Sequence, residues 1–151
     1  MPTIDAAEAA IIPAPPAAVY AILADYHERH PRILPESFRN LRVLAGGHGA
    51  GTVFQVTMEV LGTRRTYRLT VTEPEPGRVL VESDPAAGLT TTFTLTPAGE
   101  GRATHLRIAT TSSASPGLAG RIERLLSPPI MRRIYRAELA RLAAYVGVNR
   151  A

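Results

Sequence analysis

The middle of the chain, from Thr52 to Thr110, alternates apolar and polar residues and is divided by short turns rich in glycine and proline. A period of two places the apolar residues of each segment on one face of a β-strand. Short turns favour antiparallel strands, because parallel strands need long crossover connections. With the apolar run Glu8–Ile12 and a further strand at Leu41–Leu44, the pattern predicts an antiparallel sheet of six to seven strands with one covered face.

The covered face of the predicted sheet follows from the alternation. It comprises Phe54, Val56, Met58, Tyr67, Leu69, Phe93, Leu95 and Ile108. In the segment Arg78–Ser83 no face can be assigned, because Val79, Leu80 and Val81 are all apolar.

Helical periodicity flanks the strands on both sides. After Pro13–Pro16, apolar residues recur at helical spacing from Ala17, and this helix is expected to stop before Pro31, with a short second turn near Ile33. From Gly117 onward a long terminal helix is predicted. Its apolar stripe comprises first Leu118, Ile122, Leu125 and Leu126, and then Met131, Ile134, Tyr135, Leu139, Leu142 and Val146.

Two features modify the terminal helix. Ser127 followed by Pro128 is a sequence typical of a helix N-terminus, with serine as the N-cap and proline in the first turn. The Pro128–Pro129 pair is expected to kink or interrupt the helix. Arginines occupy its outer face at positions 132, 133, 136 and 141.

This order of elements, over essentially the whole chain, resembles the START-like superfamily, also called SRPBCC, which includes the birch-pollen allergen and the polyketide cyclase/dehydrase family. The segment Ala14–Tyr26, APPAAVYAILADY, is similar to the proline-bearing entry to that family's first helix. Gly49–Thr52 is similar to its glycine-rich turn. The resemblance implies a single α+β domain over residues 1–151 with the helix-grip fold, in which a curved antiparallel sheet surrounds a long C-terminal helix.

The resemblance also implies a cavity between the sheet and the last helix. We therefore expect a small hydrophobic molecule, such as a lipid, a polyketide or an aromatic metabolite, to contact the residues of the covered face together with Ile134 and Tyr135. The alternative is that these side chains fill a solid core. The sequence predicts neither the identity of the ligand nor the oligomeric state.

The composition excludes several reaction classes. The chain has no cysteine, and all 17 basic residues are arginine, so thiolate and lysine nucleophiles are absent. Weak candidates for acid–base catalysis are His30, Tyr67 and Glu138. A cyclase or dehydratase acting on a polyketide-like substrate is therefore the alternative to a binding protein, and no cofactor is expected.

The sequence gives little support for a metal site, a phosphate-binding loop or a nucleic-acid-binding surface. His27 and His30 are three residues apart and are followed by Pro31, which does not match the zinc-protease helix motif, so no metal is predicted. Gly46–Gly51 does not have phosphate-loop spacing and is interpreted as a hairpin turn. The arginine-rich helix carries few aromatic residues, which favours a solvated face over nucleic-acid binding.

The first residues, Met1–Ile12, contain no basic segment typical of a secretory signal. No apolar run approaches the ~20 residues that a membrane span requires. We therefore expect a cytoplasmic protein.

Overall fold

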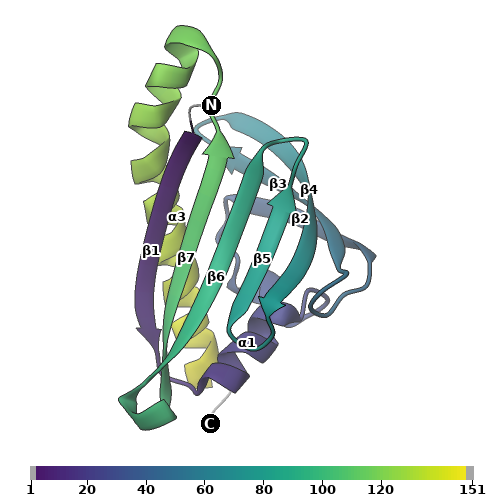
Figure 1. Ribbon diagram of the computed structural model, residues 1–151, viewed down its shortest axis with the longest axis vertical. Helices are drawn as coiled ribbons and strands as arrows, with labels where there is room; N and C mark the ends of the chain where they lie inside the picture. Colours follow the sequence, from purple (N-terminus) through teal and green to yellow (C-terminus); the bar gives the residue numbers. More distant parts are fainter. Residues whose placement is uncertain (1–2, 149–151) are drawn as a thin grey trace.

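The chain forms one seven-stranded antiparallel sheet and three α-helices in a computed structural model that describes residues 3–148 (Figure 1). The strands are β1 (Thr3–Ile12), β2 (Phe38–Ala45), β3 (Val53–Val60), β4 (Thr63–Glu75), β5 (Val79–Asp84), β6 (Leu89–Ala98) and β7 (Ala103–Ser113). The helices are α1 (Pro16–Ala24), α2 (Arg29–Ile33) and α3 (Gly117–Val148), and a 3₁₀ turn (Gly99–Gly101) joins β6 to β7.

The strands follow the order β1-β7-β6-β5-β4-β3-β2, and every pair of neighbours is antiparallel. Strands β2 to β7 therefore form a meander, and β1 pairs with the last strand. The sheet curves around α3, which runs along its covered side (Figure 1). This arrangement confirms the predicted α+β helix-grip fold.

The start of the chain has the predicted first helix, which ends before Pro31, and the predicted short second helix near Ile33, and it differs only in detail. Pro16 occupies the first turn of α1, where its missing amide donor costs nothing. The helix already ends at Ala24, and α2 begins after a short connection in which the amide of His30 donates a hydrogen bond to the carbonyl of Asp25 (2.8 Å). Pro31 lies inside α2 rather than after a helix, because the first helical amides have no partner within a helix.

Helix α3 continues through Pro128 and Pro129, so the predicted interruption and the predicted start at Ser127 are wrong. The two prolines remove amide donors to the carbonyls of Arg124 and Leu125. Both of these residues are exposed, so water can reach the freed carbonyl groups. The helix therefore accepts both prolines at a place where it is not buried.

The two halves of α3 differ in burial. The predicted stripe is confirmed in the second half, where Ile134, Tyr135, Leu139, Leu142 and Val146 are buried and Met131 is half-buried. In the first half it is wrong, because Leu118, Leu125 and Leu126 are exposed. The side chain of Ile122 lies outside the described part of the chain. Figure 1 shows the reason, since the first turns of α3 extend beyond the ends of the strands.

The strands define the covered face more fully than the sequence did. β4 extends through Pro74 to Glu75. In β5 the buried side chains are Leu80, Glu82 and Asp84, which assigns the face that the sequence left open. Two carboxyl groups, Glu82 and Asp84, therefore lie on the covered face next to the apolar Leu80.

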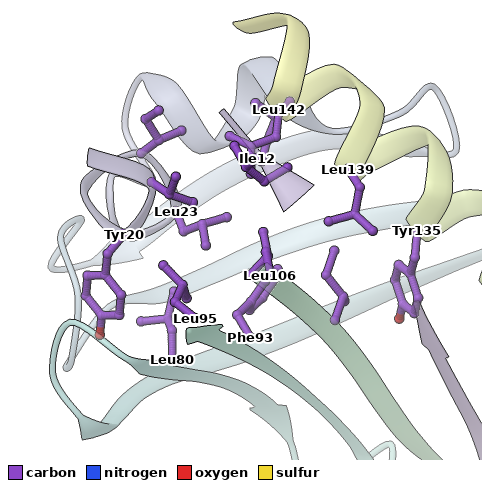
Figure 2. Packing of buried hydrophobic residues seen from close by; sticks show 14 of the residues in the cluster. Ile12, Tyr20, Leu23, Leu80, Phe93, Leu95, Leu106, Tyr135, Leu139 and Leu142 are labelled. Carbon is purple, nitrogen blue, oxygen red and sulfur yellow. The ribbon is translucent and has the colours of Figure 1, made fainter. Parts of the chain in front are cut away.

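The packed core occupies the end of the domain where α1 meets the second half of α3. Figure 2 shows Leu80, Leu95 and Leu106 of the sheet facing Leu23 of α1 and Leu142 of α3. All five side chains are at most 1% exposed. Within residues 3–148, no helix is both long and apolar enough to cross a membrane.

Candidate functional site

A cavity of about 330 Å³ lies between the covered face of the sheet and α3. Eight of the ten predicted ligand-contacting residues line it: Phe54, Val56, Met58, Tyr67, Leu69, Phe93, Ile134 and Tyr135. Met58 and Tyr67 are half-buried rather than buried, because they lie near the open end. Leu95 and Ile108 do not line the cavity and belong to the packed core.

A pair of buried polar side chains, His30 and Glu82, forms part of the inner wall. Glu82 Oε2 accepts a hydrogen bond from the hydroxyl of Tyr26 (2.7 Å) and lies 3.8 Å from His30 Nε2. Burial raises the pKa of Glu82, whereas the charge of His30 and the Tyr26 hydroxyl oppose this rise. Because burial is the largest of these effects, the net shift of the Glu82 pKa is upward.

His30 is oriented by its surroundings. Its Nδ1 lies 2.6 Å from the carbonyl of Leu23, and because a carbonyl only accepts, Nδ1 is the donor. The imidazole stacks on Tyr26 with ring centres 4.7 Å apart and meets the ring of Phe93 edge-on at 5.9 Å. Nε2 is thus the ring nitrogen directed at Glu82.

Glu138 of α3 is the second buried carboxyl group of the cavity wall. Its side-chain atom Oε2 has no hydrogen-bond partner in the described protein. Burial, together with the negative charge of Glu82, raises the pKa of Glu138 to about 8. Near neutral pH the group is therefore mainly a neutral carboxylic acid that can donate a proton into the cavity.

A chain of hydroxyl groups crosses the cavity wall from the sheet to α3. Thr91 Oγ1 and Thr110 Oγ1 are 2.7 Å apart, and Thr110 is also hydrogen-bonded to the hydroxyl of Tyr135. Burial raises the pKa of Tyr135, and the charge of Glu138 raises it further. Tyr135 therefore stays neutral and fixes α3 to the sheet.

Tyr67 lies at the opposite, outer end of the cavity. The guanidinium carbon of Arg65 is 5.1 Å from the centre of its ring, which is a cation–π distance. On the facing helix, Glu123 accepts hydrogen bonds from the amide (2.9 Å) and hydroxyl (2.7 Å) of Ser115, and these bonds lower the pKa of Glu123. Tyr67 is thus part of the mouth and is separated from the His30–Glu82 pair.

The loop Gly46–Gly51 is the hairpin connection between β2 and β3, as predicted. It also packs against the end of α1, because Gly49 donates a hydrogen bond to the carbonyl of Ala24 (2.9 Å). Asp25 there contacts Arg29 at 3.0 Å and His48 at 3.4 Å. Burial raises the pKa of Asp25, but the hydrogen bonds from Arg29 and the Glu28 amide, together with the charges of His48 and Arg29, outweigh it, so the net shift is downward. Across residues 3–148, no group of three or more His, Asp or Glu side chains is arranged to hold a metal ion.

Sequence reasoning missed Glu82 and Tyr26. The position of Glu82 two residues after Leu80 was the available signal, since both then share one strand face. The neighbouring Val79 and Val81 concealed that signal, because an uninterrupted apolar run has no period of two.

A curved antiparallel sheet that encloses an apolar cavity against a long C-terminal helix defines the class of helix-grip proteins. The model of the family described as polyketide cyclase / dehydrase and lipid transport matches residues 3–147. The chain belongs to this family, which confirms the START-like assignment made from the sequence. No sequence among functionally curated proteins matches the chain significantly.

Solved structures share the fold. The KanY protein, whose structure was determined in solution by NMR, is 31% identical, with a TM-score of 0.84 over 97% of this chain and 99% of that chain. TTHA0849 from Thermus thermophilus is 21% identical, with a TM-score of 0.76 over 99% and 100%. The Zhui aromatase/cyclase from Streptomyces sp. R1128 is 16% identical, with a TM-score of 0.73 over 95% and 93%.

Proposed function

We propose that the protein binds a small, mainly apolar molecule that places a carbonyl oxygen beside Glu138. The observation that carries this proposal is a buried carboxyl group, with an unpartnered oxygen, in the wall of an otherwise largely apolar cavity. A buried polar atom without a partner is costly, so a ligand that pairs with it gains affinity and orientation. The family to which the chain belongs supports an apolar ligand.

Matched naphthalene probes test this proposal. 1-Acetonaphthone carries a carbonyl group, whereas 1-ethylnaphthalene has nearly the same shape without it. We expect the ketone to bind more tightly at pH 6, where Glu138 is protonated, and to lose this advantage as the pH rises through about 8. Fluorescence titration or calorimetry would measure both affinities.

Glu138→Gln is the matched variant. A glutamine amide can donate a hydrogen bond at every pH, so the ketone preference should persist and its pH dependence should disappear. Equal binding of the two probes at pH 6, or an unchanged pH profile in Glu138→Gln, would overturn the role of Glu138. Failure of both probes to bind would overturn the binding proposal itself.

A second function, acid–base catalysis, is favoured by one specific arrangement. Glu138 as a proton donor and His30 as a proton acceptor line the same cavity, and His30 is held by Leu23 and faces Glu82. In the neutral form of His30 that carries its proton on Nδ1, Nε2 would remove a proton from the carbon next to a ligand carbonyl, while Glu138 gives a proton to the carbonyl oxygen, where the π electron pair of the C=O bond forms the new O–H bond. The electron pair of that C–H bond forms the C=C bond of an enol. Enolisation of this kind starts aldol cyclisation and dehydration.

Hydrogen exchange tests this second function. In D₂O, 1-acetonaphthone should lose its methyl protons faster with the protein than without it, as followed by proton NMR. His30→Gln and Glu138→Gln should each slow the catalysed exchange by about 10²-fold or more. If exchange occurs at the protein-free rate although the ketone binds, the cavity is a binding site without this chemistry.

A further inference from the structure

The mouth of the cavity is framed by two segments that are distant in sequence. Thr63 and Arg65, next to the turn between β3 and β4, line the cavity together with Glu123 and Ser127 of the first half of α3. The charge of Arg65 acts on Glu123, which places the two segments near each other. A ligand entering at this end would pass between them.

Exposed leucines are concentrated in these two segments. Of the seven large apolar side chains that are exposed in the described chain, four lie there: Leu61 (82%), Leu118 (72%), Leu125 (74%) and Leu126 (53%). Leu118 and Leu125 are about two helical turns apart and therefore point in similar directions. Single exposed leucines are ordinary, but a cluster beside a cavity mouth marks an interaction surface.

Leu61 also has an unfavourable backbone conformation. It occupies the two-residue turn between β3 and β4 with φ of 51°, a region that favours glycine or asparagine. An exposed leucine at this position improves neither the turn nor the core. Its side chain is instead presented outward at the tip of the hairpin.

Positive charge accompanies the leucines. Residues 121–133 of α3 include Arg121, Arg124, Arg132 and Arg133, and Glu123 is the acidic residue among them. Within residues 3–148, none of these four guanidinium groups forms an ion pair with a carboxylate. The surface therefore combines outward apolar side chains with uncompensated positive charge.

We propose that the mouth of the cavity docks on an anionic lipid surface through Leu61, Leu118, Leu125 and Leu126, with the arginines of α3 contacting lipid headgroups. The positive charge of the arginines favours an anionic partner, and the exposed leucines favour a partner with an apolar interior that they can enter, as in a lipid bilayer. Docking would place the cavity opening against the bilayer, so that an apolar ligand could pass between the two without crossing water. The surface is defined independently of the ligand, although its use for ligand transfer rests on the proposed function.

Vesicle binding tests the proposal. The whole protein should float with vesicles of phosphatidylcholine containing about 30% phosphatidylglycerol and should not float with pure phosphatidylcholine. Binding should weaken in about 1 M salt, where the Debye length is only ~3 Å. Each arginine removed should cost about fivefold in affinity, so Arg121→Gln/Arg124→Gln should lose about 25-fold.

Matched variants separate the mouth from general surface effects. Leu118→Ser/Leu125→Ser should abolish binding, whereas Ile11→Ser/Val148→Ser, at positions 57% and 75% exposed elsewhere on the molecule, should leave it unchanged. Arg102→Gln/Arg107→Gln, near and on β7, is the corresponding charge control. None of these residues lines the cavity, so binding of 1-acetonaphthone in the absence of vesicles should be the same in every variant.

Three results would overturn the proposal. The first is equal binding to neutral and anionic vesicles, and the second is an equal loss of binding in the control variants. The third is the absence of vesicle binding. The leucines would then serve another partner, either a second copy of the chain, seen as a dimer that Leu118→Ser/Leu125→Ser dissociates, or an acidic protein. Because probe binding is measured without vesicles, failure of the docking proposal is distinguishable from failure of the ligand proposal.

Discussion

The hydroxyl of Tyr26 donates a 2.7 Å hydrogen bond to Glu82, and both side chains are buried. Tyr26 follows α1 and Glu82 lies in β5, so the bond joins the helical connection after β1 to the middle of the sheet. It also satisfies one oxygen of a carboxylate that would otherwise face an apolar interior. The polar part of the cavity is therefore a structural element as well as a candidate site.

Tyr26→Phe tests that structural role. Removing the hydroxyl leaves Glu82 Oε2 buried without its donor, which should lower the free energy of unfolding by about 1–3 kcal/mol. Tyr20→Phe is the comparison, because its hydroxyl bonds Glu73 at 2.6 Å in a partly buried place where water can replace it. Denaturant unfolding should show the smaller loss for Tyr20→Phe. An equal or larger loss for Tyr20→Phe would contradict the importance given to Glu82.

The raised pKa of Glu138 predicts a pH dependence of stability. Its pKa is about 8 in the folded protein and about 4.5 in the unfolded chain. Between these values the folded state binds more protons, so this stabilisation is complete below pH 4.5 and is lost as the pH rises through 8. The loss amounts to at most about 1.4 kcal/mol per pH unit.

Glu138→Gln should remove this contribution. Between about pH 5 and about pH 8.5, the free energy of unfolding of the parent should therefore fall relative to that of the variant. Other groups titrate in both proteins and cancel in this comparison. Urea unfolding at half-unit pH intervals would measure it. A parallel pair of pH profiles would mean that Glu138 is ionised throughout and that its pKa is not raised by burial.

The sequence predicted the sheet and most of the cavity wall because those residues obey a local period. Phe54 and Val56 or Phe93 and Leu95 alternate with polar neighbours, so their shared face follows from strand geometry alone. What a local period cannot tell is how far the opposite layer lies from each residue. Phe93 faces the cavity while Leu95, one step along the same face, packs against α1 and α3.

Other features depend on contacts between distant segments. Leu118 and Leu125 fit the apolar stripe of α3, but that part of the helix extends past the strands and has nothing to cover it (Figure 1). Glu82 and His30 are 52 positions apart in the chain, so the local sequence around each residue carries no signal of their contact. Glu138 was a weak candidate for acid–base catalysis, but its unpartnered oxygen is visible only in the structure.

The prolines of α3 allow a direct test of local stability. Proline inside a helix costs roughly 3 kcal/mol relative to alanine, through a lost hydrogen bond and a clash with the preceding turn. Pro128→Ala/Pro129→Ala should therefore strengthen the first half of α3 and slow hydrogen exchange of the amides between Gly117 and Leu126. The amides around Leu139 should not change. Equal exchange rates near Leu125 in the parent and the variant would show that the prolines are not what limits the stability of this segment.

Substitution by tryptophan at two buried positions distinguishes the cavity from the packed core. Val56 lines the cavity, so the added volume of Val56→Trp can occupy empty space and should change stability by less than about 1 kcal/mol while blocking the binding of 1-acetonaphthone. Leu95 is completely buried in the packed core, so Leu95→Trp should overpack it and destabilise the protein by about 1–3 kcal/mol or more.

The two variants are read together. Thermal unfolding gives the stability of each, and fluorescence titration gives probe binding at a temperature where both are folded. Leu95→Trp should still bind the probe, because its side chain does not reach the cavity wall. If Val56→Trp is as destabilised as Leu95→Trp and the parent binds no probe, the space beside α3 is filled in solution. The surface around the first half of α3 would then be the remaining candidate for function.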